Sequence, residues 1–169
     1  MNNSQLSKFY KITELSPLSI NKEIVSVNDF VRESYSFLME NFNGLFEIKF
    51  DITACEHIRI PLDQIISFFK VLALNIRAKS LVFVNYSCNN SGFSIEACAK
   101  GGLPLDKAEM RKLTIFAKSA GFTVKKTAQG LLLTTAVIPE SSLSVFASVI
   151  VARNLIRERF YRIFFEEKE

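Results

Sequence analysis

The segment PLDQIISFFKVLALNIRAKSLVFVNYSCNNSGFSIEACAKGG, residues 61–102, decides the fold. Its first half predicts a helix from Pro61 to about Lys79, because apolar residues recur at spacings of three and four and proline suits the first helical position. Its second half predicts strands over 81–88 and 93–99, since a turn of Asn, Asn, Ser and Gly between two apolar runs favours an antiparallel hairpin. We expect this helix to be the centre of the fold.

The flanking segments continue the alternation of helices and strands. Ser26 with Asp29 is typical of a helix start, and the alternation over 46–52 is the period of a half-buried strand. The other expected elements are a strand over 23–27, a helix over about 105–120, a hairpin over 122–126 and 131–138, and a long helix from Pro139 to near Phe165. This order predicts an α+β fold, a two-layer α/β sandwich with helices on one face of a mixed sheet, plus a long C-terminal helix. The expected division is an N-terminal segment, 1–22, a sandwich domain, 23–138, and a C-terminal helix, 139–169.

The composition excludes several classes of protein. The chain has 169 residues, of which 49% are apolar, enough for one compact domain that needs neither a disulfide nor a metal to fold. A net charge of +4 is small for a nucleic-acid-binding protein, and the longest apolar run is too short to cross a bilayer. Three cysteines without a C-x-x-C pair, together with the lack of an export signal, predict a cytoplasmic protein. The single histidine, His57, lies in an extended pattern, so we assign it no catalytic role.

Three features carry a resemblance to a known family. They are Asn75 late in the central helix, the pair Gly101 and Gly102 after the hairpin, and the sequence AKSAGF at 117–122. In this order they resemble the ATP-binding domain of histidine kinases and their relatives, the GHKL or Bergerat superfamily, over roughly residues 23–138. The resemblance implies a sandwich of the histidine-kinase ATPase type, with Asn75, Gly101 and Gly102 at its nucleotide cleft.

The same resemblance implies that the cleft is vestigial. In the family the central helix carries a second asparagine one turn earlier for Mg²⁺, and this chain has Val71 there. Ala97 and Ala99 stand where the aspartate that holds adenine is expected, and the later glycine-rich phosphate loop is missing. We therefore expect no catalytic residue, no metal ligand and no nucleotide cofactor, with Asn75 hydrogen-bonding locally and the two glycines forming a turn.

A closer resemblance is to the C-terminal domain of bacterial histidine phosphotransferases. It rests on the segments KFYKI, LALNIRAKS followed by LVFVNYS, and IEACAKGGLPL. It implies a module that binds a response regulator or histidine kinase without nucleotide, and it implies a dimer. Phosphotransfer would need a His-bearing helical domain, on a partner chain or missing from this one, so we expect no enzyme activity.

The C-terminal helix carries two apolar stripes. One comprises Leu143, Phe146, Ile150 and Asn154, and the other Val145, Val149, Ala152, Ile156, Phe160 and Ile163. Because both must be buried, one stripe is expected on the chain's own domain and the other on a second copy or a partner helix. The candidate partner-binding residues are Arg153, Ile156, Arg157, Phe160, Ile163 and Phe164. The arginines and phenylalanines also suit an anionic membrane, but nearby glutamates make this alternative weaker.

A group of basic residues forms a further candidate surface. It comprises Arg111, Lys112, Lys118, Lys125 and Lys126. It is either a solvated face or a binding surface, and an acidic response regulator suits it as well as nucleic acid, since no aromatic residues interleave to stack bases. The sequence thus favours a non-catalytic, kinase-like protein-binding module of a two-component phosphorelay. The alternatives are a divergent ATP-binding kinase or anti-sigma-like kinase, and an adaptor that acts through its C-terminal amphipathic helix.

Overall fold

The computed structural model describes residues 22–53, 56–76, 80–139 and 153–165. In chain order the elements are β1 (Glu23–Ser26), α2 (Val27–Asn41), β2 (Phe46–Ile52), β3 (His57–Ile60), α3 (Leu62–Asn75), β4 (Val82–Asn89), β5 (Gly92–Ala99), α4 (Lys107–Ser119), β6 (Thr123–Lys126), β7 (Gly130–Thr135) and α5 (Arg153–Phe165). The predicted N-terminal segment up to residue 21 and the predicted helical residues 77–79 and 140–152 lie outside the described residues.

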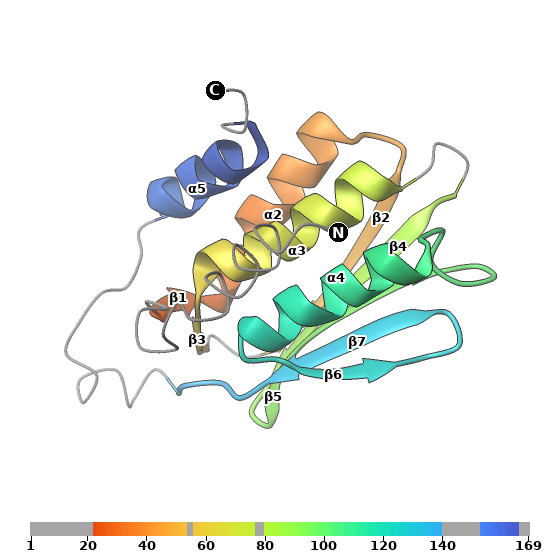
Figure 1. Cartoon of the computed structure of the whole chain (residues 1–169). Coiled ribbons are helices and arrows are strands. Elements are labelled where there is room, and N and C mark those ends of the chain that lie inside the picture. The colour runs from red at the N-terminus through yellow and green to blue at the C-terminus, as the bar shows by residue number, and fades with distance from the viewer. Residues whose placement is uncertain (1–21, 54–55, 77–79, 140–152, 166–169) are drawn as a thin grey trace, which may run out of the picture.

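Five strands form one mixed sheet in the order β2-β4-β5-β7-β6. β2 and β4 are parallel, and the other neighbouring pairs are antiparallel. β1 and β3 form a separate antiparallel pair. Helices α2, α3 and α4 cover one face of the five-stranded sheet, and α5 packs on α2 and α3 (Figure 1). The predicted fold class, an α+β two-layer sandwich with a further C-terminal helix, is confirmed.

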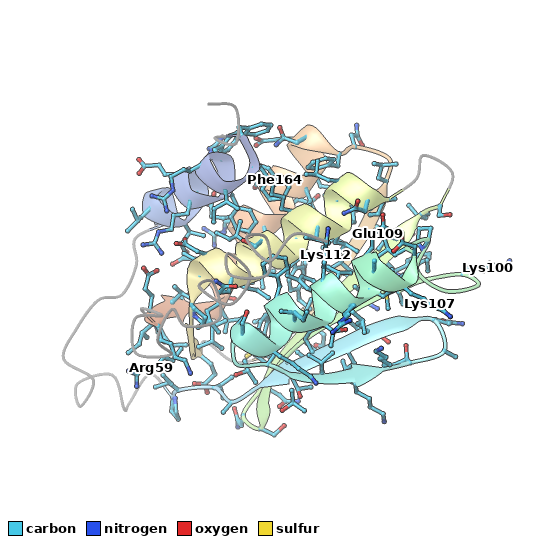
Figure 2. All side chains as sticks on the ribbon, in the orientation of Figure 1. Arg59, Lys100, Lys107, Glu109, Lys112 and Phe164 are labelled. Carbon is cyan, nitrogen blue, oxygen red and sulfur yellow. The ribbon has the colours of Figure 1, made fainter. Side chains whose placement is uncertain are left out.

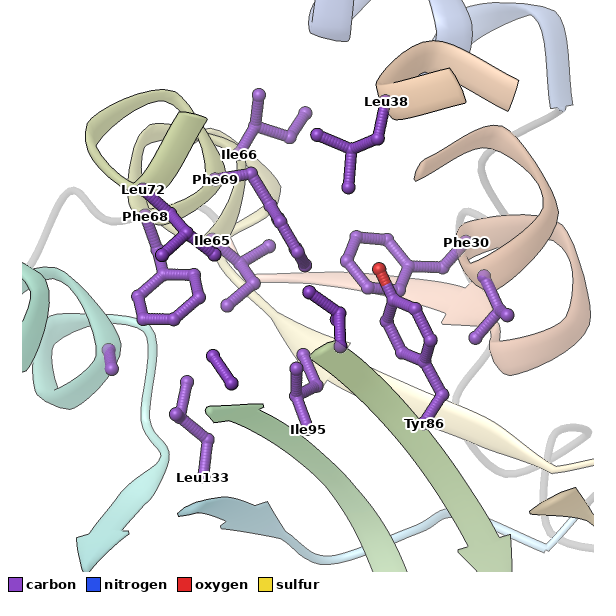
Figure 3. Packing of buried hydrophobic residues seen from close by; sticks show 14 of the residues in the cluster. Phe30, Leu38, Ile65, Ile66, Phe68, Phe69, Leu72, Tyr86, Ile95 and Leu133 are labelled. Carbon is purple, nitrogen blue, oxygen red and sulfur yellow. The ribbon is translucent and has the colours of Figure 1, made fainter. Parts of the chain in front are cut away.

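The core lies between the sheet and α2, α3 and α4. Alternate residues of β4 and β5, such as Tyr86, Phe93 and Ile95, are buried because the strand period of two places them on the helical side. Phe68 and Phe69 of α3 are fully buried against them, and Figure 3 shows side chains of α2 and α3 directed toward the strands. The prediction that this helix is central is confirmed.

The ends of the helices follow from local chemistry. The side chain of Ser26 accepts a hydrogen bond from the backbone N–H of Asp29 at 3.4 Å and so caps α2, as the sequence predicts. Helix α4 ends before Gly121, whose φ of 84° lies in the left-handed region that glycine adopts without strain. No described helix is long and apolar enough to cross a membrane.

Candidate functional site

The residues of the predicted cleft lie at one end of the sheet. Val82 at the start of β4 pairs with Ala99 at the end of β5, so the chain after α3 and the chain after β5 meet there. The side-chain amide of Asn75 donates to the backbone oxygen of Val71 at 2.8 Å, inside its own helix. Gly101 and Gly102 have φ angles of 85° and 100° and form a turn.

The positions at which the resemblance places the adenine-binding aspartate are apolar and buried. Ala97 and Ala99 are buried on the helical side of β5. Glu96, the nearest carboxylate along the strand, lies on the opposite face because successive strand residues alternate. There it accepts a hydrogen bond from the Asn85 side chain at 3.0 Å. The strand therefore presents methyl groups rather than a carboxylate to the core side.

The N-terminus of α4 is capped by the chain's own carboxylates. Asp106 accepts hydrogen bonds from the backbone N–H groups of Ala108 at 2.7 Å and Glu109 at 2.8 Å. In return the Glu109 carboxylate accepts from the backbone N–H of Asp106 at 2.7 Å, which completes a capping box. The groups with which a helix N-terminus usually binds an anion are thus occupied, and two negative charges stand beside them.

The exposed side of α4 carries a groove of about 590 Å³. Its apolar part is formed by Leu105, Met110 and Ile115, and Ile115 is 55% exposed. Five charged side chains also line it, four of them basic: Asp106, Lys107, Arg111, Lys118 and Lys126. Figure 2 shows Lys107 and Glu109 near one end of α4, with Lys112 further along the same helix. We call this surface the α4 groove.

The sequence predicted part of the α4 groove. Three of the five basic residues singled out above, Arg111, Lys118 and Lys126, line it, whereas Lys112 and Lys125 are exposed outside its lining. Its apolar part was missed because Ile115 was grouped with the buried face of the helix. Leu113 and Ala117 are four residues apart and fully buried, and Ile115 falls midway between them, on the other side of the helix. That spacing is the signal that places Ile115 outside the core.

The structure corrects the predicted partner surface on the C-terminal helix. Ile156, Phe160 and Phe164 are 0%, 0% and 8% exposed and belong to the chain's own core. Ile163 is half-buried, and the side chain of Arg153 lies outside the description. The reason is that an aromatic cluster of α2 and α3 receives this stripe: the Phe160 ring lies 5.3 Å from that of Phe37, 6.3 Å from that of Phe30 and 6.3 Å from that of Phe69.

Polar contacts hold α5 in the same place. Tyr161 donates to the Glu40 carboxylate at 2.8 Å, and Arg157, an exposed member of the predicted set, lies 3.6 Å from the same group. The Lys70 ammonium donates to the backbone oxygen of Ile163 at 2.8 Å (Figure 2 shows the neighbouring Phe164 between α5 and α2). α5 is therefore an integral part of the fold.

His57 lies in β3, in agreement with the extended pattern of its sequence. Its backbone exchanges two hydrogen bonds with Ile138, at 3.0 and 2.6 Å, which link β3 to the segment after β7. Its side chain is 8% exposed, and its Nδ1 has no hydrogen-bond partner within the described residues. This position belongs to the β1 and β3 pair, away from the predicted cleft.

Comparisons with known proteins show similarity to solved structures. No family model matches the chain, and no curated protein matches it. Among solved structures, the chain is similar to the cytoplasmic segment of the histidine kinase QseC, with 13% sequence identity and a TM-score of 0.45. The alignment covers 80% of this chain and 86% of that one.

Proposed function

We propose that the chain is a non-catalytic protein-binding module of a two-component phosphorelay, similar to the C-terminal domain of histidine phosphotransferases. Its partner is a response regulator, whose acidic surface it binds through the α4 groove. The assignment to a phosphorelay comes from the resemblance of the sequence. The observation that carries the binding role is the groove itself, in which the exposed Ile115 and two half-buried apolar side chains lie beside four basic side chains, three on α4 and Lys126 on β6.

The α4 groove supports binding of an acidic protein surface for two physical reasons. Removing the exposed Ile115 side chain and the accessible part of Met110 from water would favour binding of a partner. Basic side chains at the margin, Arg111, Lys118 and Lys126, steer an oppositely charged surface toward the groove and disfavour a basic one. A histidine kinase with an acidic docking surface is the second candidate partner by the same chemistry.

Three observations favour a module that does not bind ATP. The N-terminus of α4 is occupied by the carboxylates of Asp106 and Glu109, which repel phosphate. The buried positions Ala97 and Ala99 offer no acceptor for the adenine amino group. Val71 stands one helical turn before Asn75, so that turn of α3 carries one side-chain amide oxygen for Mg²⁺ rather than two.

The first experiment measures binding of a response-regulator receiver domain, recovered by co-purification from a bacterial lysate. We expect Arg111→Glu and Lys118→Glu each to weaken binding by about tenfold, because each places a like charge against an acidic partner. Arg59→Glu is the matched control, since this exposed residue of β3 lies outside the α4 groove and undergoes the same change of charge. Equal losses in all three variants, or no receiver domain in the purified complex, would contradict the proposal.

The second experiment separates a binding module from a kinase. Calorimetric titration with ATP and Mg²⁺ is expected to give no saturable heat. A dissociation constant below about 100 μM, equivalent to about −5.5 kcal/mol, would favour the divergent kinase instead.

A further inference from the structure

Within the described part of the chain, β2 forms an open edge of the sheet. Among the described strands it is hydrogen-bonded only to β4, and its seven residues contain neither proline nor glycine (Figure 1). The backbone N–H of Val82 donates to the oxygen of Leu45 at 2.9 Å, and that of Thr53 donates to the oxygen of Cys88 at 3.0 Å. Because strand residues alternate, the odd-numbered residues bond to β4. The backbone groups of Phe46, Ile48, Phe50 and Ile52 therefore point to the open edge.

An exposed apolar surface adjoins this edge. Phe50 is 55% exposed and Tyr35 of α2 is 37% exposed, and their rings meet edge to face at 5.7 Å. With Val31 and Ile52 they line a pocket of about 300 Å³. Edge strands that avoid pairing usually carry charged side chains on the inward face, proline or a bulge. On β2 the inward positions Ile48, Phe50 and Ile52 are all apolar.

We propose that β2 pairs with β2 of a second copy of this chain, antiparallel and about a two-fold axis at Phe50. In this register Phe50 lies opposite Phe50 of the second copy, and Ile48 lies opposite Ile52. All these residues point their backbone groups to the open edge, so each opposed pair exchanges hydrogen bonds. The two five-stranded sheets become one continuous sheet, and the aromatic pair of Phe50 and Tyr35 is covered.

Charge complementarity is the observation that selects a second copy as the occupant. On the outer face of β2, the chosen register places Lys49 opposite Asp51 of the second copy, twice by symmetry, so both pairs attract. A register centred on Lys49 would oppose Lys49 to itself and Glu47 to Asp51, and both contacts would repel. A register centred on Ile48 opposes Glu47 to Lys49 and does not involve Asp51. The charges on β2 thus allow two β2 strands to pair, and they disfavour the register centred on Lys49.

This interface differs from the one expected from the sequence. The dimer was predicted on the C-terminal helix, whose described part packs on its own domain through Ile156, Phe160 and Phe164. β2 is at the opposite end of the strand order from β6. Lys126 of β6 lines the α4 groove, so dimerisation through β2 does not use that groove. Dimerisation through β2 can therefore be tested independently of the proposed function.

The first test measures the mass of the full chain by sedimentation equilibrium. The wild type is expected to be a concentration-dependent dimer, and Phe50→Lys is expected to weaken dimerisation by at least about tenfold. Ile115→Lys is the matched control, because Ile115 is equally exposed at 55% but lies on α4. A circular-dichroism melt shows whether each variant is folded. A monomeric wild type at about 100 μM, or an equal loss in both variants, would overturn the proposal.

Charge exchange tests the register. Lys49→Glu and Asp51→Lys are each expected to weaken the dimer, because each opposes two like charges, and the double variant is expected to restore it. In the register centred on Ile48, Asp51→Lys would have no effect and the double variant would stay weak. That pattern would overturn the two-fold axis at Phe50.

Discussion

The hydroxyl of Tyr86 is a polar group inside the apolar core, and its hydrogen bond can be assigned. It lies 2.8 Å from the hydroxyl of Ser34, which itself donates to the backbone oxygen of Val31 at 2.9 Å. Since Ser34 has a single hydrogen, Tyr86 must be the donor in their bond. Burial raises the pKa of Tyr86. The phenol therefore stays neutral in the folded chain at any pH near neutrality.

Replacement of Tyr86 by phenylalanine is expected to change stability in a pH-dependent way. At pH 7, Tyr86→Phe should lower the free energy of unfolding by about 1 kcal/mol through the lost hydrogen bond. Above about pH 10 the unfolded tyrosine ionises while the buried one does not, so the wild type loses stability that the variant keeps. The difference between the two proteins should therefore shrink or reverse at about pH 10.5 in urea unfolding.

Tyr35→Phe is the control for this measurement, because the Tyr35 side chain is 37% exposed rather than buried. A wild-type loss between the two pH values no larger than that of Tyr86→Phe would contradict the prediction.

At the scale of elements, α5 is held by its apolar stripe more than by its ion pairs. The exposed pair of Arg157 with Glu40 contributes little, because water screens both charges. A fully buried phenylalanine such as Phe160 contributes several times as much through the water-exposed area that it removes. Side chains of α2 and α3, including Phe37 and Phe69, form the other wall of this contact.

Truncation of Phe160 should therefore be costly. Phe160→Ala leaves a cavity bordered by three aromatic rings, and we expect the free energy of unfolding to fall by about 3–5 kcal/mol in urea titration. Leu155→Ala, a truncation in the same helix at a side chain that is 41% exposed, should change it by about 0.5 kcal/mol or less. Similar losses in the two variants would show that α5 is not packed as described.

Apart from β3, which was noted only as an extended pattern around His57, the elements could be predicted from local sequence, because the apolar periods of two and 3.6 are local properties. Both hairpins and the cap at Ser26 follow from such signals. The partner of each apolar face could not be predicted in this way. The sequence pattern of the stripe with Ile156 and Phe160 is the same whether the stripe packs on its own domain or on another chain. Only the tertiary arrangement of α2 and α3 determines which of the two occurs. The exposure of Phe50 was also missed, since the alternation of β2 does not reveal that the strand lies at an edge.

At the scale of the molecule, one connected core joins the sheet to all four described helices. Buried residues of α5 and of β4, including Phe160 and Tyr86, both contact Phe69 of α3. The two ends of the described chain, β1 and α5, are also joined by the ion pair between Glu23 and Arg159. Such a core is expected to unfold in one cooperative step.

Amide hydrogen exchange measures this cooperativity. Amides in the middle of α5 should show the same free energy of exchange as those of β4, because neither element can open without breaking the shared core. Mass spectrometry of peptides that cover 156–164 and 82–89 provides the comparison. Exchange in α5 at a free energy several kcal/mol lower would show that the helix detaches on its own.

The capping box at the N-terminus of α4 limits the kind of ligand that this helix can bind. Asp106 and Glu109 already fill the position where a single phosphoryl group would otherwise dock. A ligand would therefore bind to the side of α4, through many weak contacts spread over several helical turns. In the role proposed above, binding there would depend on the shape and overall charge of the partner, and one phosphate added or removed at the helix N-terminus would change it little.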